Sequence, residues 1–171
     1  MRAFSKSRKA TGLVALAAAA SLALAGCAAA EPTAEPSETS TIAQGDGVLK
    51  IGAIVPFTGG LAFLSPPEIA GIDLAVADIN AAGGVLGKPV EVTYEDSGDT
   101  TTPELAPASA TKLLSEGVDA IIGAASSSVT RLIIDQITGA KVVQVSMANT
   151  APDLTTWDDG GYYFRTAPSD I

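Results

Sequence analysis

The sequence predicts an α/β fold, a three-layer α/β/α domain whose parallel sheet is covered by helices on both faces. From residue 48 onward, short strand-like runs alternate with longer segments of helical periodicity. The strand-like runs are almost continuously apolar, which is typical of parallel strands that are buried on both faces. The connections between such strands are expected to be right-handed.

Five strands are expected in this region. Each run is rich in β-branched or aromatic residues, and glycine, proline or polar residues separate it from its neighbours. The expected strands cover residues 48–55, 90–94, 118–122, 142–145 and a run that begins at 162. The folded part, residues 48–171, has a length that suits one domain.

Three helices are expected between the first four strands. The first, residues 68–82, repeats apolar residues every three or four positions and stops at a glycine pair. The second is expected to have Thr102 as its N-cap and Pro103 as its first residue, and to run to Gly117. The third is expected to end at Gly139. The predicted buried faces are Ile69, Ile72, Val76 and Ile79 in the first helix and Val129, Ile133 and Ile137 in the third.

Residues 1–26 have the pattern of a secretory signal peptide, with a basic start followed by an alanine-rich apolar run. That run has about 14 residues, whereas a membrane span needs about 20. Cys27, the only cysteine, follows Leu24-Ala25-Gly26, which resembles the lipobox of bacterial lipoproteins. The resemblance implies that Cys27 carries a lipid anchor; the alternative is an ordinary signal peptide followed by a chance cysteine. Residues 28–47 are rich in Pro, Glu and Ser and predict a flexible tether between Cys27 and the folded domain.

The composition makes several functions improbable. Residues 27–171 contain six Lys and Arg against 19 Asp and Glu, a net charge near −13 that would repel nucleic-acid phosphates. The sequence has no histidine, the commonest general base and metal ligand. We therefore expect no nucleic-acid partner, no metal and no cofactor. Glu95, Asp96 and Asp99 lack the ligand spacing of a calcium loop, and a capping role at the strand end is the favoured alternative.

Several segments resemble the branched-chain amino-acid-binding (Leu/Ile/Val-binding) family, the substrate receptors of ABC importers. The segments that carry the resemblance are residues 69–87, Tyr94-Glu95-Asp96, residues 117–123, Ser126-Ser127-Ser128, residues 148–155 and residues 164–170. The resemblance implies a type I periplasmic-binding-protein fold, with two α/β lobes joined by a hinge and the ligand between them. Because similar proteins continue for about as long again or more, the chain is expected to represent a truncated first lobe.

The serine run is the strongest candidate for a ligand site. In an open parallel sheet, ligands bind beyond the carboxyl ends of the strands, and the loops 56–67, 124–128 and 146–156 leave those ends. Ser126, Ser127 and Ser128 lie where a strand turns into a helix. Hydroxyls and free N–H groups at a helix N-terminus attract a carboxylate. The alternative is that these serines only cap the helix.

The resemblance adds further candidates in the other two loops. It implies that Ala148 offers its carbonyl to the ammonium group of a ligand, and that Thr150 offers its hydroxyl and N–H to the carboxylate. Asn149 replaces a residue that is often small in the family and is expected on the pocket rim. Phe63 and Leu64 are expected to form an apolar wall. The alternatives are a plain turn before residue 152 and ordinary packing.

These observations predict a non-catalytic, lipid-anchored substrate-binding protein on the outer face of the cell membrane. Its expected partners are a branched-chain amino acid or a related small amino acid or amide, an ABC transporter permease and the membrane. One alternative is an α/β lipoprotein hydrolase that uses a serine of residues 126–128; another is a ligand sensor without a transporter. Because one lobe encloses only about half of a ligand, the chain alone is expected to bind weakly.

Overall fold

The computed structural model describes residues 45–171. Cys27, the predicted signal peptide and most of the predicted tether lie outside these described residues. The strands are β1 (Lys50–Val55), β2 (Glu91–Asp96), β3 (Ala120–Gly123), β4 (Val143–Ser146) and β5 (Tyr163–Arg165). The α-helices are α1 (Ser65–Ala81), α2 (Leu105–Ser115) and α3 (Ser127–Gly139), with short 3₁₀ helices at Ala62–Leu64 and Pro152–Thr156. Within residues 45–171, no helix combines the length and apolar character of a membrane span.

The five strands form one parallel sheet in the order β2-β1-β3-β4-β5. Every neighbouring pair is parallel, and β1 lies between β2 and β3, so the chain reverses its direction of travel across the sheet after β2. This arrangement confirms the α/β class and the expected order of strands and helices. It also brings the carboxyl ends of all five strands to the same edge of the sheet.

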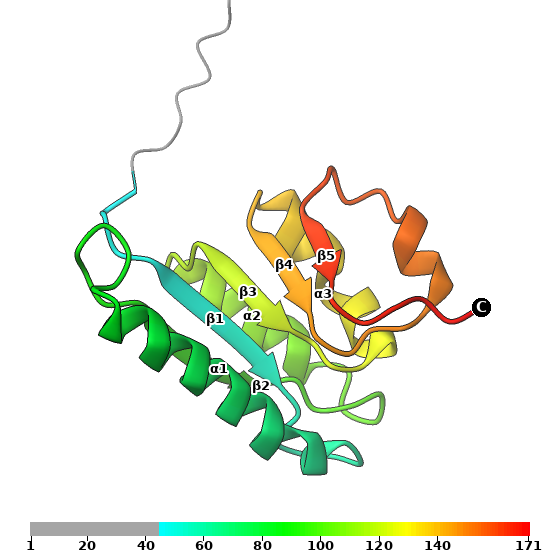
Figure 1. Cartoon of the computed structure of the whole chain (residues 1–171). Coiled ribbons are helices and arrows are strands. Elements are labelled where there is room, and N and C mark those ends of the chain that lie inside the picture. The colour runs from blue at the N-terminus through cyan, green and yellow to red at the C-terminus, as the bar shows by residue number, and fades with distance from the viewer. Residues whose placement is uncertain (1–44) are drawn as a thin grey trace, which may run out of the picture. The chain divides into compact units, whose positions relative to one another are not determined.

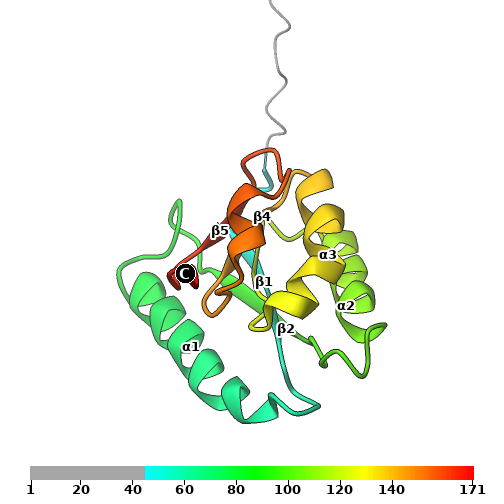
Figure 2. The same ribbon diagram turned by 90° about the vertical axis from the view of Figure 1, so that its right-hand side faces the viewer.

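Helices α2 and α3 cover one face of the sheet, and α1 lies against the other (Figures 1 and 2). The α2/α3 side holds the main hydrophobic core. Val129, Ile133 and Ile137 are fully buried there, which confirms the predicted face of α3. The helices lie close to the sheet: a Cβ on Gly52 would meet Leu113 Cδ1 of α2 at 2.7 Å.

Helix α1 is less buried than its periodicity predicted. Of its predicted face, Ile72 is buried, Ile69 and Val76 are half-buried, and Ile79 is 39% exposed. A groove of about 410 Å³ lies beside the first part of α1. Residues from both sides line this groove, among them Glu68, Ile72, Ile122 and Met147. The helix also begins three residues before the expected start, because prolines are tolerated in a first helical turn.

Helix α2 begins at Leu105, so the prediction that Thr102 is its N-cap was wrong. Thr102 Oγ1 instead accepts the N–H of Asp99 at 3.1 Å, and the Thr102 carbonyl accepts the N–H of Leu105 at 3.1 Å. Residue 102 therefore stabilises a turn that precedes the helix. Pro107 lies in the first turn of α2, where a missing N–H costs no hydrogen bond.

A second apolar cluster joins α3 to the segment between β4 and β5. Ile134, Leu154 and Tyr163 are buried together, with Trp157 packed against them. The Trp157 indole also donates to Asp135 Oδ1 at 2.7 Å. Trp157 and Tyr163 therefore pack within this domain.

Candidate functional site

The loops that follow β1, β3 and β4 leave the same edge of the sheet, so the predicted site residues lie on neighbouring segments (Figure 1). The loop after β1 is tied to the end of β2 by Asp96. Its carboxylate accepts the backbone N–H of Phe57 at 3.0 Å, of Thr58 at 3.2 Å and of Gly98 at 2.8 Å. It also accepts the Thr58 hydroxyl at 2.6 Å. This carboxylate therefore connects the two loops and holds the segment that leads to Phe63.

The neighbouring carboxylate, Asp99, has a similar role. It accepts the N–H of Gly60 at 2.8 Å and both the hydroxyl and the N–H of Thr101. Burial alone would raise the pKa of Asp96, but its hydrogen bonds outweigh burial and lower that pKa. Hydrogen bonds from Thr101 and Gly60 likewise lower the pKa of Asp99. These contacts match the capping role that the sequence favoured for this loop. Over residues 45–171, no three acidic, His or Cys side chains gather as a metal site would require.

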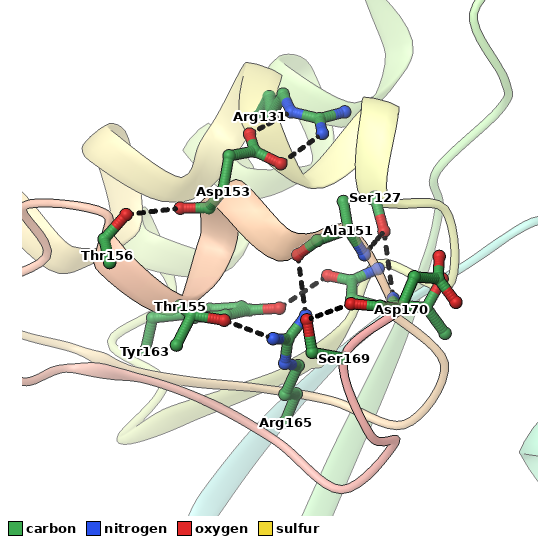
Figure 3. Close-up of polar contacts among 12 residues, drawn as sticks. Ser127, Arg131, Ala151, Asp153, Thr155, Thr156, Tyr163, Arg165, Ser169 and Asp170 are labelled. Carbon is green, nitrogen blue, oxygen red and sulfur yellow. Dashed lines mark hydrogen bonds and ion pairs between the residues drawn. The ribbon is translucent and has the colours of Figure 1, made fainter.

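The three serines after β3 have three different environments. Ser126 is the N-cap residue of α3 in an extended conformation, and its carbonyl accepts the N–H of Thr130 at 2.9 Å, while its side chain makes no capping bond. Ser127 Oγ accepts the N–H groups of Thr150 and Ala151, each at 3.2 Å (Figure 3). Ser128 is exposed. Ser127 therefore bridges two of the loops, whereas the hydroxyls of Ser126 and Ser128 form no hydrogen bond to residues 45–171.

The loop after β4 places Ala148 and Thr150 at the surface as half-buried residues. The Thr150 carbonyl accepts the N–H of Asp170 at 2.8 Å. The Thr150 N–H, which the resemblance assigned to a ligand carboxylate, donates to Ser127 Oγ instead. Among the residues that the structure describes, nothing bonds to the Thr150 hydroxyl or to the Ala148 carbonyl, so these two groups are free to face a ligand.

Asn149 is fully buried, so its side chain lies beneath the site and does not form the pocket rim that the sequence suggested. Its amide nitrogen donates to the carbonyls of Ala124 at 3.0 Å and Ala125 at 2.8 Å. Its amide oxygen accepts the Tyr163 hydroxyl at 2.7 Å. Both amide hydrogens and the amide oxygen thus have partners within the protein, which explains why a polar residue is stable there.

Two arginines form hydrogen bonds with the segment after β4 (Figure 3). Arg165 donates to the Ala151 carbonyl at 2.8 Å and to Thr155 Oγ1 at 2.6 Å. Arg131 of α3 forms a two-bond ion pair with Asp153, at 2.7 and 2.6 Å, which lowers the pKa of Asp153. Sequence reasoning did not assign these contacts. In the sequence, the only indication of these contacts is that Arg131 and Arg165 are positively charged residues in a strongly acidic chain.

Phe63 is 71% exposed in the 3₁₀ helix before α1, and Leu64 beside it is half-buried. Ser65 anchors this helix to the end of β1 by donating its hydroxyl to the Pro56 carbonyl at 2.5 Å. The Phe63 ring is therefore held on a tethered segment and is accessible. Its role as an apolar wall stays a prediction.

Comparison with known proteins agrees with this architecture. Residues 48–170 match the family model described as "Periplasmic binding protein". The chain belongs to the periplasmic binding protein family. Within that family, it is 35% identical over 108 residues to a Leu/Ile/Val/Thr-binding protein of Salmonella typhimurium. The match covers 63% of this chain and 29% of the relative, so the chain spans less than a third of the length of this curated relative.

Solved structures show the same likeness. A branched-chain amino acid transporter substrate-binding protein from Streptococcus pneumoniae, in complex with isoleucine, is 33% identical with a TM-score of 0.63. The match covers 71% of this chain and 34% of that one. A solute-binding protein of an ABC transporter from Rhodopseudomonas palustris, in complex with 3,4-dihydroxybenzoic acid, is 27% identical with a TM-score of 0.62. There the match covers 72% of this chain and 33% of the other. In both structures, the matched part is about a third of the solved chain.

Proposed function

We propose that this periplasmic binding protein binds the carboxylate end of a small amino acid at the edge formed by the loops after β3 and β4. The observation that carries the proposal is that unpaired polar groups lie on the two neighbouring loops there, which Ser127 ties together. The Ser126 hydroxyl precedes α3, and the Thr150 hydroxyl and the Ala148 carbonyl lie on the loop that Ser127 bonds to the helix. An acceptor for an ammonium group thus lies on the same loop as a donor for a carboxylate.

The electrostatics of α3 favour an anionic group at this position. The helix has 13 residues, and its first hydrogen bond is from the Thr130 N–H to the Ser126 carbonyl. The N–H groups of residues 127–129 therefore lack helical acceptors and add to the positive end of the helix dipole. No positively charged side chain is needed to attract a carboxylate in such a place.

The relatives indicate what kind of ligand to expect. One binds isoleucine and another binds 3,4-dihydroxybenzoic acid, and both of these ligands combine a carboxylate with an apolar body. We therefore propose a branched-chain amino acid, or a related small amino acid or amide, with Phe63 and Leu64 contacting its apolar part. The described residues present one face to such a ligand, and we expect affinities on the order of millimolar from this face alone.

We further propose that the protein serves an ABC importer as an extracytoplasmic lipoprotein. The pattern of residues 1–26 and the position of Cys27 support export and lipidation, and the family likeness supports a permease as partner. Binding without catalysis fits the site, because the chain contains no histidine and Ser127 Oγ already accepts two backbone N–H groups. Mass spectrometry of the membrane fraction would detect a diacylglycerol on Cys27, and an unmodified thiol would contradict the anchor.

Ligand-observed saturation-transfer NMR would test the proposal, because it detects weak binding. Leucine, isoleucine and valine should show transfer, and methyl protons should show more than the Cα proton if Phe63 contacts the side chain. Ser126→Ala and Thr150→Val should reduce the transfer, whereas Ser115→Ala, an exposed serine at the end of α2, should not. Equal transfer in all three variants would refute this location.

A further inference from the structure

We propose that Asn149 is a positioning residue of the ligand site, with its side-chain amide fixing the two peptide units that precede α3. The inference rests on the proposed function, because it concerns how the site presents N–H groups to a carboxylate. Asn149 is fully buried and uses both amide hydrogens on consecutive carbonyls, those of Ala124 and Ala125. One side chain thus bonds to two successive peptide units.

The orientation of these carbonyls determines where the following N–H groups point. In a trans peptide, the C=O of one residue and the N–H of the next are antiparallel. The peptide bonds after Ala124 and Ala125 are trans. Because both carbonyls face Asn149, the N–H groups of Ala125 and Ser126 point away from it. Neither N–H has an acceptor among residues 45–171, so two adjacent donors directly precede the free N–H groups of α3.

Tyr163 determines which way the amide faces. Its hydroxyl donates to the Asn149 oxygen at 2.7 Å, so the NH₂ group must face the two carbonyls. Burial raises the pKa of the Tyr163 phenol, which keeps the hydroxyl protonated as a donor at neutral pH. The Ala124 carbonyl also accepts from Ser146 Oγ at 2.8 Å and Thr130 Oγ1 at 3.3 Å, but Asn149 is the partner of the Ala125 carbonyl within the described part of the chain.

Thr130→Val is a matched control for Asn149→Ala. It removes a buried donor to the Ala124 carbonyl while leaving the Ala125 carbonyl untouched. Titrations of leucine and leucinamide, followed by protein NMR, compare a ligand that has a carboxylate with one that lacks it. Asn149→Ala should weaken leucine binding roughly tenfold, because donors to a charged group lose their alignment, and should change leucinamide binding far less. Thr130→Val should leave the leucine-to-leucinamide ratio unchanged. A purely structural role would weaken both ligands equally, and that result would overturn the inference.

Two further measurements keep the test decisive. Tyr163→Phe removes only the group that orients the amide, so it should change the leucine-to-leucinamide ratio in the same direction even if Asn149→Ala fails to fold. If the unmodified protein binds neither ligand, the proposed function fails, and the positioning is judged from the ligand-free protein. The ¹³C carbonyl resonance of Ala125 should then move in Asn149→Ala and stay in place in Thr130→Val. An unmoved Ala125 resonance in Asn149→Ala would overturn the inference.

Discussion

Replacing Asp96 with asparagine should destabilise the fold, because it removes the negative charge. The asparagine side chain has nearly the same shape and can still join the loop after β1 to the end of β2. In the structure, Oδ1 accepts three backbone N–H groups, and Oδ2 accepts the Thr58 hydroxyl. An asparagine can keep its oxygen toward the N–H groups and donate its NH₂ to the Thr58 hydroxyl. The four contacts survive as neutral hydrogen bonds, and only the charge assistance is lost.

The size of the effect follows from those four bonds. Hydrogen bonds to charged groups contribute about 1 kcal/mol more than neutral ones, but Asp96 is only partly buried, so water weakens the difference. We expect Asp96→Asn to lower the free energy of unfolding by about 1.5 kcal/mol at pH 7. Urea unfolding monitored by Trp157 fluorescence would measure this change. Asp78→Asn is the matched control, since the exposed Asp78 carboxylate makes no hydrogen bond to the described residues, and it should leave stability almost unchanged.

The pH dependence gives a second, independent check on Asp96. Its pKa is lower in the folded than in the unfolded protein, so its stabilising contribution is present above the unfolded value of about 4. That contribution is lost as the pH falls through the lowered folded pKa. The difference in unfolding free energy between the unmodified protein and Asp96→Asn should therefore shrink below pH 4. A difference that stays constant from pH 7 to the acid range would refute the assigned role of the charge.

Three other substitutions test packing, backbone geometry and surface charge. Ile133→Ala in the main core should lower the free energy of unfolding by about 2–5 kcal/mol. Leu132, the neighbouring residue, is 43% exposed, so Leu132→Ala should lower it by less than about 1 kcal/mol. Urea titration would measure both changes, and equal changes would contradict the assigned core. Gly84→Ala should be much more destabilising than Gly87→Ala, as judged by melting temperature. Both glycines have positive φ, but of the two only Gly84 would bring a Cβ against a backbone oxygen, that of Lys88, at 2.0 Å. Similar losses of melting temperature in the two variants would refute the steric reasoning. Because the ion pair between Arg131 and Asp153 is solvent-exposed, Arg131→Ala should change the free energy of unfolding by under about 1 kcal/mol. High salt should reduce that change. A large decrease in the free energy of unfolding that salt does not affect would contradict this assignment.

The sequence was sufficient for the architecture because the architecture depends on local patterns. Alternating strand-like and helical periodicity predicted the order of the elements, and the spacing of Val129, Ile133 and Ile137 predicted the face of α3 that is fully buried. The face of α1 was predicted less well, since periodicity shows which side of a helix is apolar and not how closely that side approaches the sheet. Helix ends were less certain for the same reason, as Thr102 shows: a threonine caps a turn or a helix equally well.

The chemistry of the site depended on contacts that no local pattern records. Asn149 meets the Ala124 carbonyl 25 residues away and the Tyr163 hydroxyl 14 residues away, and these partners place it beneath the site instead of on the rim. Ser127 was indistinguishable from Ser126 and Ser128 in the sequence, yet it alone of the three bonds to the Thr150 and Ala151 N–H groups in the structure. The sequence thus located the three loops, and the fold determined which of their polar groups remain free.

The central claim is that an amino-acid carboxylate binds where the loops after β3 and β4 meet. A ¹H–¹⁵N NMR titration of the protein with leucine tests it most directly, because each backbone N–H reports separately. The account predicts that the largest shifts occur at residues 125–128 and at Thr150, with smaller shifts at Phe63. Shifts confined to the hollow between the end of α3 and the loop before β5, lined by Asp135, Lys141 and Tyr162, would contradict it, as would no shift anywhere.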